Sequence, residues 1–533
     1  MKKIFFSLIA ALTLQSANAA TINISGALTG TNNWTSTNTY ILNGPVYALS
    51  NAVLNIEAGT VIKGQTNATA ATISALFITR GAKINANGTA NSPIIFTSVL
   101  DNTADPFDLT LYQRGLWGGV VILGNGKINT ASNADGNAAS PKFDIYEGLS
   151  TNLVHGEYVH RFGGNDDDDN SGVFRYVSIR HGGKVLESSK EINGLSMCAV
   201  GRGTTIEFVE CYAIADDGFE FWGGTVNTKY LVSAFNDDDT FDADEGYTGK
   251  NQFWFSIQEP GARDKGFELN GEPDGIGVNA ALKAKFVVYN ATTIGAGTNS
   301  GGANNNAFNI KGYASPSIYN SIFTDYAQRG IAIDATSFTN FTLGDGDLRN
   351  NLWWGFTGGS NPNSMTNICI TTNAQILFTD AARSNSIVNP LLRGIGRLDN
   401  GMLDPRPQVG SPALTGGLTL PNDGFYTQVT YRGAFDANDL WLSGWTALSE
   451  YEILVVALPP IIAPTMSINT AGGSITMGCA SQIGRTYQLQ SAGSLGTLTV
   501  WNNVGSSMAG TGSNINFVQP IGATNAFYQI KVQ

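Results

Sequence analysis

Cysteine and histidine are scarce in this sequence. Only 4 cysteines and 3 histidines occur among 533 residues. There is neither a C-x-x-C pair nor a Cys/His cluster, which excludes a disulfide-dense scaffold and a zinc site of the usual kind. Cys198 and Cys211 are near enough in sequence to pair across neighbouring strands in an oxidising compartment, whereas two buried free thiols explain them equally well.

Long apolar stretches are missing after the first twenty residues. The chain begins MKKIFFSLIAALTLQSANA, with two lysines, an apolar run and the small residues Ala17 and Ala19. This pattern predicts a secretory signal peptide over residues 1–19, because the run is shorter than the roughly 20 residues that span a bilayer. We therefore expect an exported protein, secreted or held at the cell surface, without membrane insertion.

Basic residues are outnumbered by acidic ones. The sequence has 30 Lys and Arg against 42 Asp and Glu, and removal of Lys2 and Lys3 with the signal peptide leaves 28 against 42, a net charge of −14. Nucleic acids and anionic membranes attract basic patches, so neither is expected as a partner. The charge suits cations, and neutral or basic polymers.

Glycine-rich turns and short β-rich runs make up most of the chain. The 63 glycines separate runs rich in β-branched and aromatic residues, such as AVLNIEAGTVIKG, TIEFVECYAI and TKYLVSAF. The apolar residue after each polar turn recurs at steps of 22, 26, 41 and 23 residues, at Phe219, Phe241, Phe267, Phe308 and Ile331. A period in the low twenties predicts an all-β, right-handed parallel β-helix, with the 41-residue step interpreted as two coils. The phenylalanines are expected to form an internal ladder with rungs about 4.8 Å apart.

Several segments between residues 50 and 450 are similar to known proteins. They include LNIEAGTVIKG, ALFITRGAKINANGTANSPIIFTS, GLWGGVVILGNGKIN, the stretch from TTIEFVECYAIADDGFEF to GKNQFWF, and DGFYTQVTYRGAFDANDLWLSGWTAL. Together they resemble a widespread group of secreted bacterial β-helix proteins in the pectate-lyase-like superfold. The resemblance implies a β-helix with terminal caps over residues 20–457, and it implies no single activity, because superfolds host many.

The composition changes near residue 458. The segment ALPPIIAPTM is apolar and proline-rich, which predicts a semi-rigid linker over residues 458–466. Residues 467–533 then contain six or seven short β-rich runs with Gly, Ser and Asn turns, which predicts a small β-sandwich. This part is similar to C-terminal modules of secreted bacterial proteins, and the similarity implies attachment, recognition or sorting.

Carboxylates gather in the stretch IADDGFEFWGGTVNTKYLVSAFNDDDTFDADEGYTG, residues 214–249. Stacking of the coils would bring them onto neighbouring rungs, with Asp264 and Glu268 on the rung above. Carboxylates this close repel strongly, and Ca²⁺, which takes six to eight oxygen ligands, removes the repulsion. The alternative is a solvated acidic face without an ion. The predicted calcium ligands are Asp216, Asp217, Glu220, Asp237, Asp238, Asp239, Asp242, Asp244 and Glu245.

Two further features leave alternatives open. The run Asp166–Asp169 is either a flexible acidic loop or a second calcium site, and it lacks the ligand spacing of an EF-hand. A tryptophan on such a fold either packs in the core or presents its ring to a sugar. The tryptophans to which this applies are Trp222, Trp254, Trp353 and Trp354.

Two enzyme classes use a solenoid of this kind. A polysaccharide lyase needs a cation and a base, for which Arg180, His181 and Lys184 in IRHGGK are the candidates. A glycoside hydrolase needs two carboxylates, for which Asp217 with either Asp238 or Asp239 is the candidate pair. The polygalacturonase pattern is only partly present, because no NTD or RIK follows in order.

The sequence therefore favours a secreted, monomeric, calcium-stabilised β-helix protein at the bacterial surface. Its expected partner is an extracellular polysaccharide or cell-surface glycan. A polysaccharide lyase, a glycoside hydrolase and a purely structural adhesin are the alternatives.

Overall fold

The computed structural model describes residues 20–66, 72–130, 133, 140–187, 190–271, 282–301, 304–357, 361–455, 466–482, 485–496, 499–511, 513–522 and 526–532. The chain divides into two compact units, Met1–Val455 and Val456–Gln533. The predicted signal peptide, residues 1–19, lies outside the described residues, as does the predicted linker except for its last residue.

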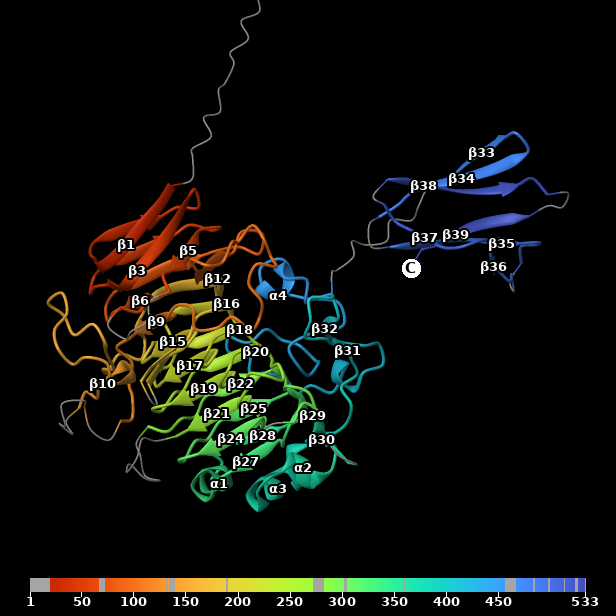
Figure 1. The fold of residues 1–533 in the computed structure, drawn as a ribbon. Coiled ribbons are helices and arrows are strands. Elements are labelled where there is room, and N and C mark those ends of the chain that lie inside the picture. The colour runs from red at the N-terminus through yellow and green to blue at the C-terminus, as the bar shows by residue number, and fades with distance from the viewer. Residues whose placement is uncertain are drawn as a thin grey trace, which may run out of the picture. The chain divides into compact units, whose positions relative to one another are not determined.

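The first unit is a parallel β-helix, as Figure 1 shows by its stacked coils. Every long-range pairing in its main sheet is parallel, and each coil contributes strands to three faces. The first face contains β2 (Thr31–Trp34), β4 (Val53–Ile56), β7 (Lys83–Asn87), β22 (Val287–Tyr289), β25 (Ser317–Tyr319), β28 (Asp347–Arg349) and the first halves of β12 (Gly172–Arg180), β16 (Thr205–Tyr212), β18 (Asn227–Ala234) and β20 (Lys250–Ile257).

The other two faces continue the same coils. The second face contains β5 (Val61–Gly64), β8 (Ile94–Ser98), the second halves of β12, β16, β18 and β20, β23 (Thr292–Ile294), β26 (Ile322–Tyr326), β29 (Leu352–Phe356) and β30 (Ser386–Ile387). The third face contains β6 (Ala75–Ile78), β9 (Val120–Leu123), β15 (Leu195–Cys198), β17 (Phe219–Trp222), β19 (Phe241–Asp244), β21 (Phe267–Asn270), β24 (Phe308–Lys311) and β27 (Ile331–Ile333). The strands β1 (Ala20–Leu28) and β3 (Asn38–Ala48) span the second and third faces at the N-terminal end.

Short elements close and decorate the stack. Three helices lie at the end of the stack away from β1 (Figure 1): α1 (Ala335–Thr342), α2 (Met365–Ile368) and α3 (Thr372–Thr379). The remaining elements of this unit are β10 (Asp144–Ile145), η1 (Tyr146–Gly148), β11 (Arg161–Phe162), β13 (Lys184–Glu187), β14 (Lys190–Ile192), η2 (Ala381–Arg383), β31 (Leu392–Ile395), β32 (Leu403–Pro407), η3 (Pro412–Leu414) and α4 (Ala447–Glu450).

A bend of left-handed backbone separates the first and second faces. Tyr176, Phe208, Tyr230 and Phe253 occupy this bend on four successive coils, with φ between 48° and 58°. Their rings stack with centroids 4.3, 4.1 and 4.9 Å apart. A positive φ is unfavourable for an aromatic residue, so the stacking offsets a cost that recurs on each coil.

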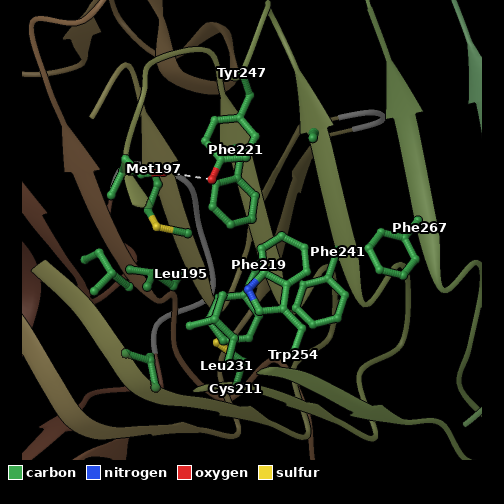
Figure 2. Packing of buried hydrophobic residues seen from close by; sticks show 14 of the residues in the cluster. Leu195, Met197, Cys211, Phe219, Phe221, Leu231, Phe241, Tyr247, Trp254 and Phe267 are labelled. Atoms are coloured by element: carbon green, nitrogen blue, oxygen red, sulfur yellow. Dashed lines mark hydrogen bonds between the residues drawn. The ribbon is translucent and has the colours of Figure 1, made fainter. Parts of the chain in front are cut away.

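The predicted internal ladder is confirmed. Phe219, Phe241 and Phe267 stand in register on β17, β19 and β21 and are buried, with centroids 5.7 and 5.3 Å apart. Figure 2 shows them in one row, with Trp254 lying against Phe241 from the opposite wall of the solenoid. The interpretation of the 41-residue step as two coils is wrong. Phe267 pairs directly with Phe308, so one coil carries a long insertion.

All four cysteines are buried free thiols. Cys198 belongs to the third face and Cys211 to the second, and the two side chains pack into different hydrophobic clusters. Of the two alternatives for Cys198 and Cys211, a disulfide or two buried free thiols, the second is confirmed.

The second unit contains two small antiparallel sheets that share one hydrophobic core, as predicted. Met477 and Phe517 from one sheet pack with Tyr487 and Leu489 from the other. The sheets consist of β33 (Ser467–Ala471), β34 (Ser474–Ala480) and β38 (Asn514–Pro520), and of β35 (Thr486–Ala492), β36 (Asn502–Asn503), β37 (Met508–Ala509) and β39 (Phe527–Val532).

Candidate cation site

Eight carboxylates lie together on the third face, in β17, β19 and β21 and in the turns that precede these strands. We call this set the acidic face. The pairing of these strands places residues three and two before each ladder phenylalanine, and the residue after it, in columns along the solenoid. The first column is Asp216, Asp238 and Asp264, the second is Asp217, Asp239 and Lys265, and the third is Glu220, Asp242 and Glu268.

The second column is fixed by a ladder of side-chain hydrogen bonds. The Oδ1 of Asn193 accepts the N–H of Asp217 at 3.2 Å, and the Oδ1 of Asp217 accepts the N–H of Asp239 at 2.9 Å. The Oδ1 of Asp239 in turn accepts the N–H of Lys265 at 2.5 Å. One oxygen of each of these buried carboxylates therefore holds the next turn, so the column has a structural role whether or not an ion is bound.

The carboxylates form four overlapping groups of three. In each group, one oxygen from every member lies within 4.8 Å of the others. The groups are Asp216–Asp217–Asp238, Asp217–Glu220–Asp242, Asp238–Asp239–Asp264 and Asp239–Asp242–Glu268. Hard oxygen donors at this density suit Ca²⁺, which takes its ligands from carboxylates, carbonyls and water.

Burial and mutual repulsion raise the pKa values of this cluster. Burial, aided by Asp238, raises the pKa of Asp216 to about 9, and burial with Asp264 raises that of Asp238 to about 6. Burial also raises the pKa values of Asp217, Asp239 and Asp242 well above the ordinary aspartate range. A cation between the oxygens would remove the repulsion that causes part of these shifts.

One end of the acidic face is neutralised by lysines. The Nζ of Lys265 lies 3.0 Å from Asp264 and 3.6 Å from Glu268, and Lys311 lies 2.7 Å from Glu268. These contacts outweigh the effect of burial on Glu268 and lower its pKa to about 2. The three carboxylates furthest from the lysines along the stack, on the rung of β17, have no basic side chain as an ion-pair partner in the described part of the chain.

Three predicted ligands lie outside the four groups. Burial raises the pKa of Asp237, and the charges that act on it are those of Arg114 and Glu259 rather than those of the acidic face. Asp244 accepts the N–H of Glu245 and a hydrogen bond from Asn270. Burial, aided by the charges of Asp144 and Asp244, raises the pKa of Glu245 well above its ordinary value.

The predicted bases Arg180 and His181 lie beneath the C-terminal segment of this unit. Arg180 is fully buried, pairs with Glu450 at 2.6 Å and donates to Ser178 Oγ at 2.8 Å. His181 is also fully buried, its Nδ1 contacts the carbonyl of Gln113 at 2.7 Å, and burial lowers its pKa to about 4. Neither side chain belongs to the acidic face, because β12 ends on the second face of the solenoid.

Lys184 lies nearer to the acids. It follows Gly183, where an added Cβ would lie 3.0 Å from the backbone nitrogen of Asp216. Its Nζ donates to the carbonyl of Gly115 at 3.4 Å and forms no ion pair within the described residues. It is therefore the one predicted base close in the fold to the acidic face.

Three charged residues near the acidic face were not predicted. Lys265 could have been found, because aligning DKGFEL with DDGFEF places it in the column of Asp217. Lys311 could have been found in the same way, four residues into the strand FNIK. Glu147 comes from an insertion and acts on the pKa values of Asp216 and Glu220; burial raises its own pKa to about 7. No repeat pattern marks Glu147.

The acidic run Asp166–Asp169 is held by hydrogen bonds and ion pairs. Asp167 pairs with Lys127 at 2.5 Å, Asp168 with Arg202 at 3.2 Å, and Asp169 accepts from Asn125 at 2.9 Å. The run contributes to none of the four carboxylate groups found among the described residues.

A comparison with protein families agrees with this architecture. Residues 26–351 match the family model described as a pectate-lyase like beta helix domain. The crystal structure of the bacteriophage CBA120 tailspike protein 2 enzymatically active domain is similar at 10% identity, over 93% of this chain and 68% of that one, with a TM-score of 0.21. A likeness of that extent carries no argument. No curated protein matches the sequence.

No helix among the described residues has the length and apolar character needed to cross a membrane. The family match covers well over half of the 533 residues and coincides with the stacked parallel strands. The chain belongs to the family of pectate-lyase-like β-helix domains.

Proposed function

We propose that this protein is an exported calcium-binding β-helix that contacts extracellular polysaccharide through its acidic face. The observation that supports this proposal is the four overlapping groups of carboxylates, with ligand oxygens within 4.8 Å in each. In this proposal residues 1–19 direct export, residues 20–457 form the binding solenoid, and residues 467–533 attach or sort it beyond a linker at 458–466.

The residues best placed to hold calcium are those on the rungs of β17 and β19. Asp216, Asp217, Glu220, Asp238 and Asp242 belong to the two groups furthest from Lys311. With one oxygen from each member, a group of three carboxylates supplies three of the six to eight oxygens that Ca²⁺ takes. A bound ion would therefore have coordination positions left for water or for hydroxyl and carboxylate oxygens of a polysaccharide.

A lyase at the same site is less well supported, because a base is lacking. Lys265 stands in a column of the acidic face, but its ion pairs outweigh the effect of burial and raise its pKa above the ordinary value. It therefore remains protonated and serves as a charge. Arg180 and His181 are buried elsewhere. Lys184 is the residue whose replacement tests the lyase alternative.

A glycoside hydrolase is the second alternative, and the raised pKa of Asp216 favours it, because a general acid must be protonated. The crowding opposes it. Hydrolases place two carboxyl groups about 5–5.5 Å or 6.5–9.5 Å apart with the glycosidic bond between them, whereas Asp217 and Asp238, with oxygens within 4.8 Å, share their surroundings with further acids. Such crowding suits a shared cation better than a reacting glycosidic bond.

The test is a thermal melt in EGTA and after restoring Ca²⁺, on the wild type and on Asp217→Asn and Asp239→Asn. Asparagine keeps the Oδ1 acceptor of the ladder, as Asn193 does one rung earlier, so these variants remove charge and leave the hydrogen bond in place. The proposal expects a calcium-dependent rise in melting temperature in the wild type that is smaller in both variants. No rise in the wild type would exclude the calcium site.

A panel of acidic and neutral polysaccharides separates the functional alternatives. If the protein only binds, a polysaccharide in the gel slows its migration in affinity electrophoresis and no products are released. A lyase releases unsaturated products that absorb ultraviolet light, and a hydrolase releases reducing ends alone. Lys184→Met should leave binding unchanged under the proposal and abolish product formation under the lyase alternative.

A further inference from the structure

Trp354 forms one wall of a cavity of about 360 Å³ on the second face of the solenoid. It lies in β29, in register with Thr324 of β26, and the cavity continues to Asn389, Leu392 and Arg393. Small-molecule pockets commonly range from about 300 to 1,000 Å³ and combine apolar walls with a few polar groups. The cavity shares no residue with the acidic face, which belongs to the third face.

Trp354 differs from the tryptophans that hold the fold together. The indole N–H groups of Trp117, Trp254 and Trp441 donate to Arg180 O, Thr228 Oγ1 and Ala434 O respectively. Their rings, like that of Trp353, pack against other aromatic rings. Trp354 is half-buried and, among the described residues, has neither an aromatic neighbour nor a hydrogen-bond partner for its N–H. Its ring is therefore available to a ligand.

The floor beneath the ring is rigid. Asp325, with a φ of 62°, accepts hydrogen bonds from the N–H and Oγ1 of Thr298 at 2.9 and 2.7 Å. Its other carboxylate oxygen pairs with Arg397 at 2.7 Å. Gly355 follows Trp354 with a φ of 75°, and an added Cβ would lie 3.5 Å from both Thr298 Oγ1 and the nitrogen of Asp325. The cavity is thus formed before a ligand arrives, which lowers the ordering cost of binding.

The rim supplies hydrogen-bond donors with unused capacity. The Oδ1 of Asn389 accepts the N–H of Leu391 at 2.8 Å, which fixes the amide and leaves Nδ2 without a partner among the described residues. Arg393 donates to Ala437 O at 2.5 Å, lies 3.8 Å from Asp404, and has a side chain 31% exposed. Each charge at the cavity already faces an opposite one, so the cavity favours an uncharged ligand.

We propose that this cavity binds one pyranose ring of a neutral polysaccharide. The apolar C–H face of the sugar lies on the ring of Trp354, and its hydroxyl groups accept hydrogen bonds from Asn389 and Arg393. The choice of a sugar rests on the proposed polysaccharide contact, but the residues are different and no metal takes part. A solenoid with contacts on two faces would hold a glycan network at two places.

The experiment is isothermal titration of the full chain with neutral oligosaccharides of glucan, mannan and xylan type, in EDTA. The wild type should bind at least one of them saturably. Trp354→Ala should weaken that binding at least tenfold, equivalent to about 1.4 kcal/mol, and Trp354→Phe should retain most of it because the aromatic face remains. The matched control is Tyr112→Ala, an aromatic residue 64% exposed outside the cavity, which should bind as the wild type does.

Asn389→Ala provides a second test at an exposed rim position, should Trp354→Ala fail to fold. It should also weaken binding. The inference is wrong if no oligosaccharide of the panel binds, if EDTA abolishes binding, or if neither variant differs from the wild type. If Ca²⁺ fails to raise the melting temperature but an oligosaccharide still binds, the proposal for the acidic face is contradicted and this one is not.

Discussion

Replacement of Asp238 by asparagine should change stability in opposite directions with and without calcium. Asp238 belongs to two of the four carboxylate groups, and no backbone N–H of the described residues donates to its side chain. Asparagine is nearly the same size, so the substitution removes a charge without opening a cavity or breaking a ladder. In EGTA the negative charge of Asp238 is repelled by its neighbours, whereas with Ca²⁺ bound its carboxylate is a ligand of the ion.

The size of the effect follows from the pKa. Burial and Asp264 raise the pKa of Asp238 from its ordinary 3.8 to about 6, and each unit corresponds to about 1.4 kcal/mol, so ionising Asp238 at pH 8 costs about 3 kcal/mol of folding free energy. One pair of charges 4.8 Å apart gives a similar figure of about 3.5 kcal/mol at an effective dielectric of 20. The variant does not carry this cost. With an unfolding entropy of about 2 cal/mol/K per residue over the first unit, its melting temperature in EGTA should be roughly 3 °C above that of the wild type.

Calcium should reverse the order. Free Ca²⁺ at 1,000 times its Kd stabilises the folded wild type by about 4.1 kcal/mol, which exceeds the cost of about 3 kcal/mol in EGTA, and the variant, which lacks a shared ligand, should gain much less. Scanning calorimetry at pH 8 measures both states. The control is Asp345→Asn, outside the four groups, which accepts from Lys283 and Lys285 at 2.8 and 2.6 Å and has a lowered pKa. It should lower the melting temperature equally in both buffers. The reasoning fails if Asp238→Asn melts below the wild type in EGTA.

Three further outcomes follow from the same structure. In EGTA the protein should be most stable near pH 4 and lose stability as the pH rises through about 6 and then about 9, because Asp238 and Asp216 have folded pKa values above their unfolded ones. A series of thermal melts across this pH range measures the decline. Ca²⁺, whose affinity rises with pH, should make the decline smaller. Arg180→Met should cost about 3–5 kcal/mol in urea unfolding, since it removes the cation that faces the buried Glu210 and the half-buried Glu450, and an unchanged midpoint would contradict that role. A reducing agent should leave the melting temperature unchanged, and thiol titration of the denatured chain should count four free groups.

The repeat pattern was enough to predict the solenoid, because one local rule recurs on every coil. A polar turn, an inward aromatic residue and an outward acid follow one another at Phe219 and again at Phe241, and stacking in register brings like onto like. The same rule failed at the step from Phe267 to Phe308, because an insertion lengthens a coil without changing which strands pair. Spacing alone does not distinguish a long loop from an unrecognised rung.

The sequence by itself determined the β-rich coils, the buried aromatic ladder and the presence of six of the nine predicted ligands in the carboxylate groups. These depend on contacts between neighbouring coils, about two dozen residues apart, which the period encodes. Only the tertiary structure showed that Arg180 and His181 are buried beneath residues near 450. It alone also placed Glu147 beside the acidic face and Asn389 at the cavity. Those contacts join segments outside the repeat, and their positions follow from how insertions and the C-terminal segment pack on the finished solenoid.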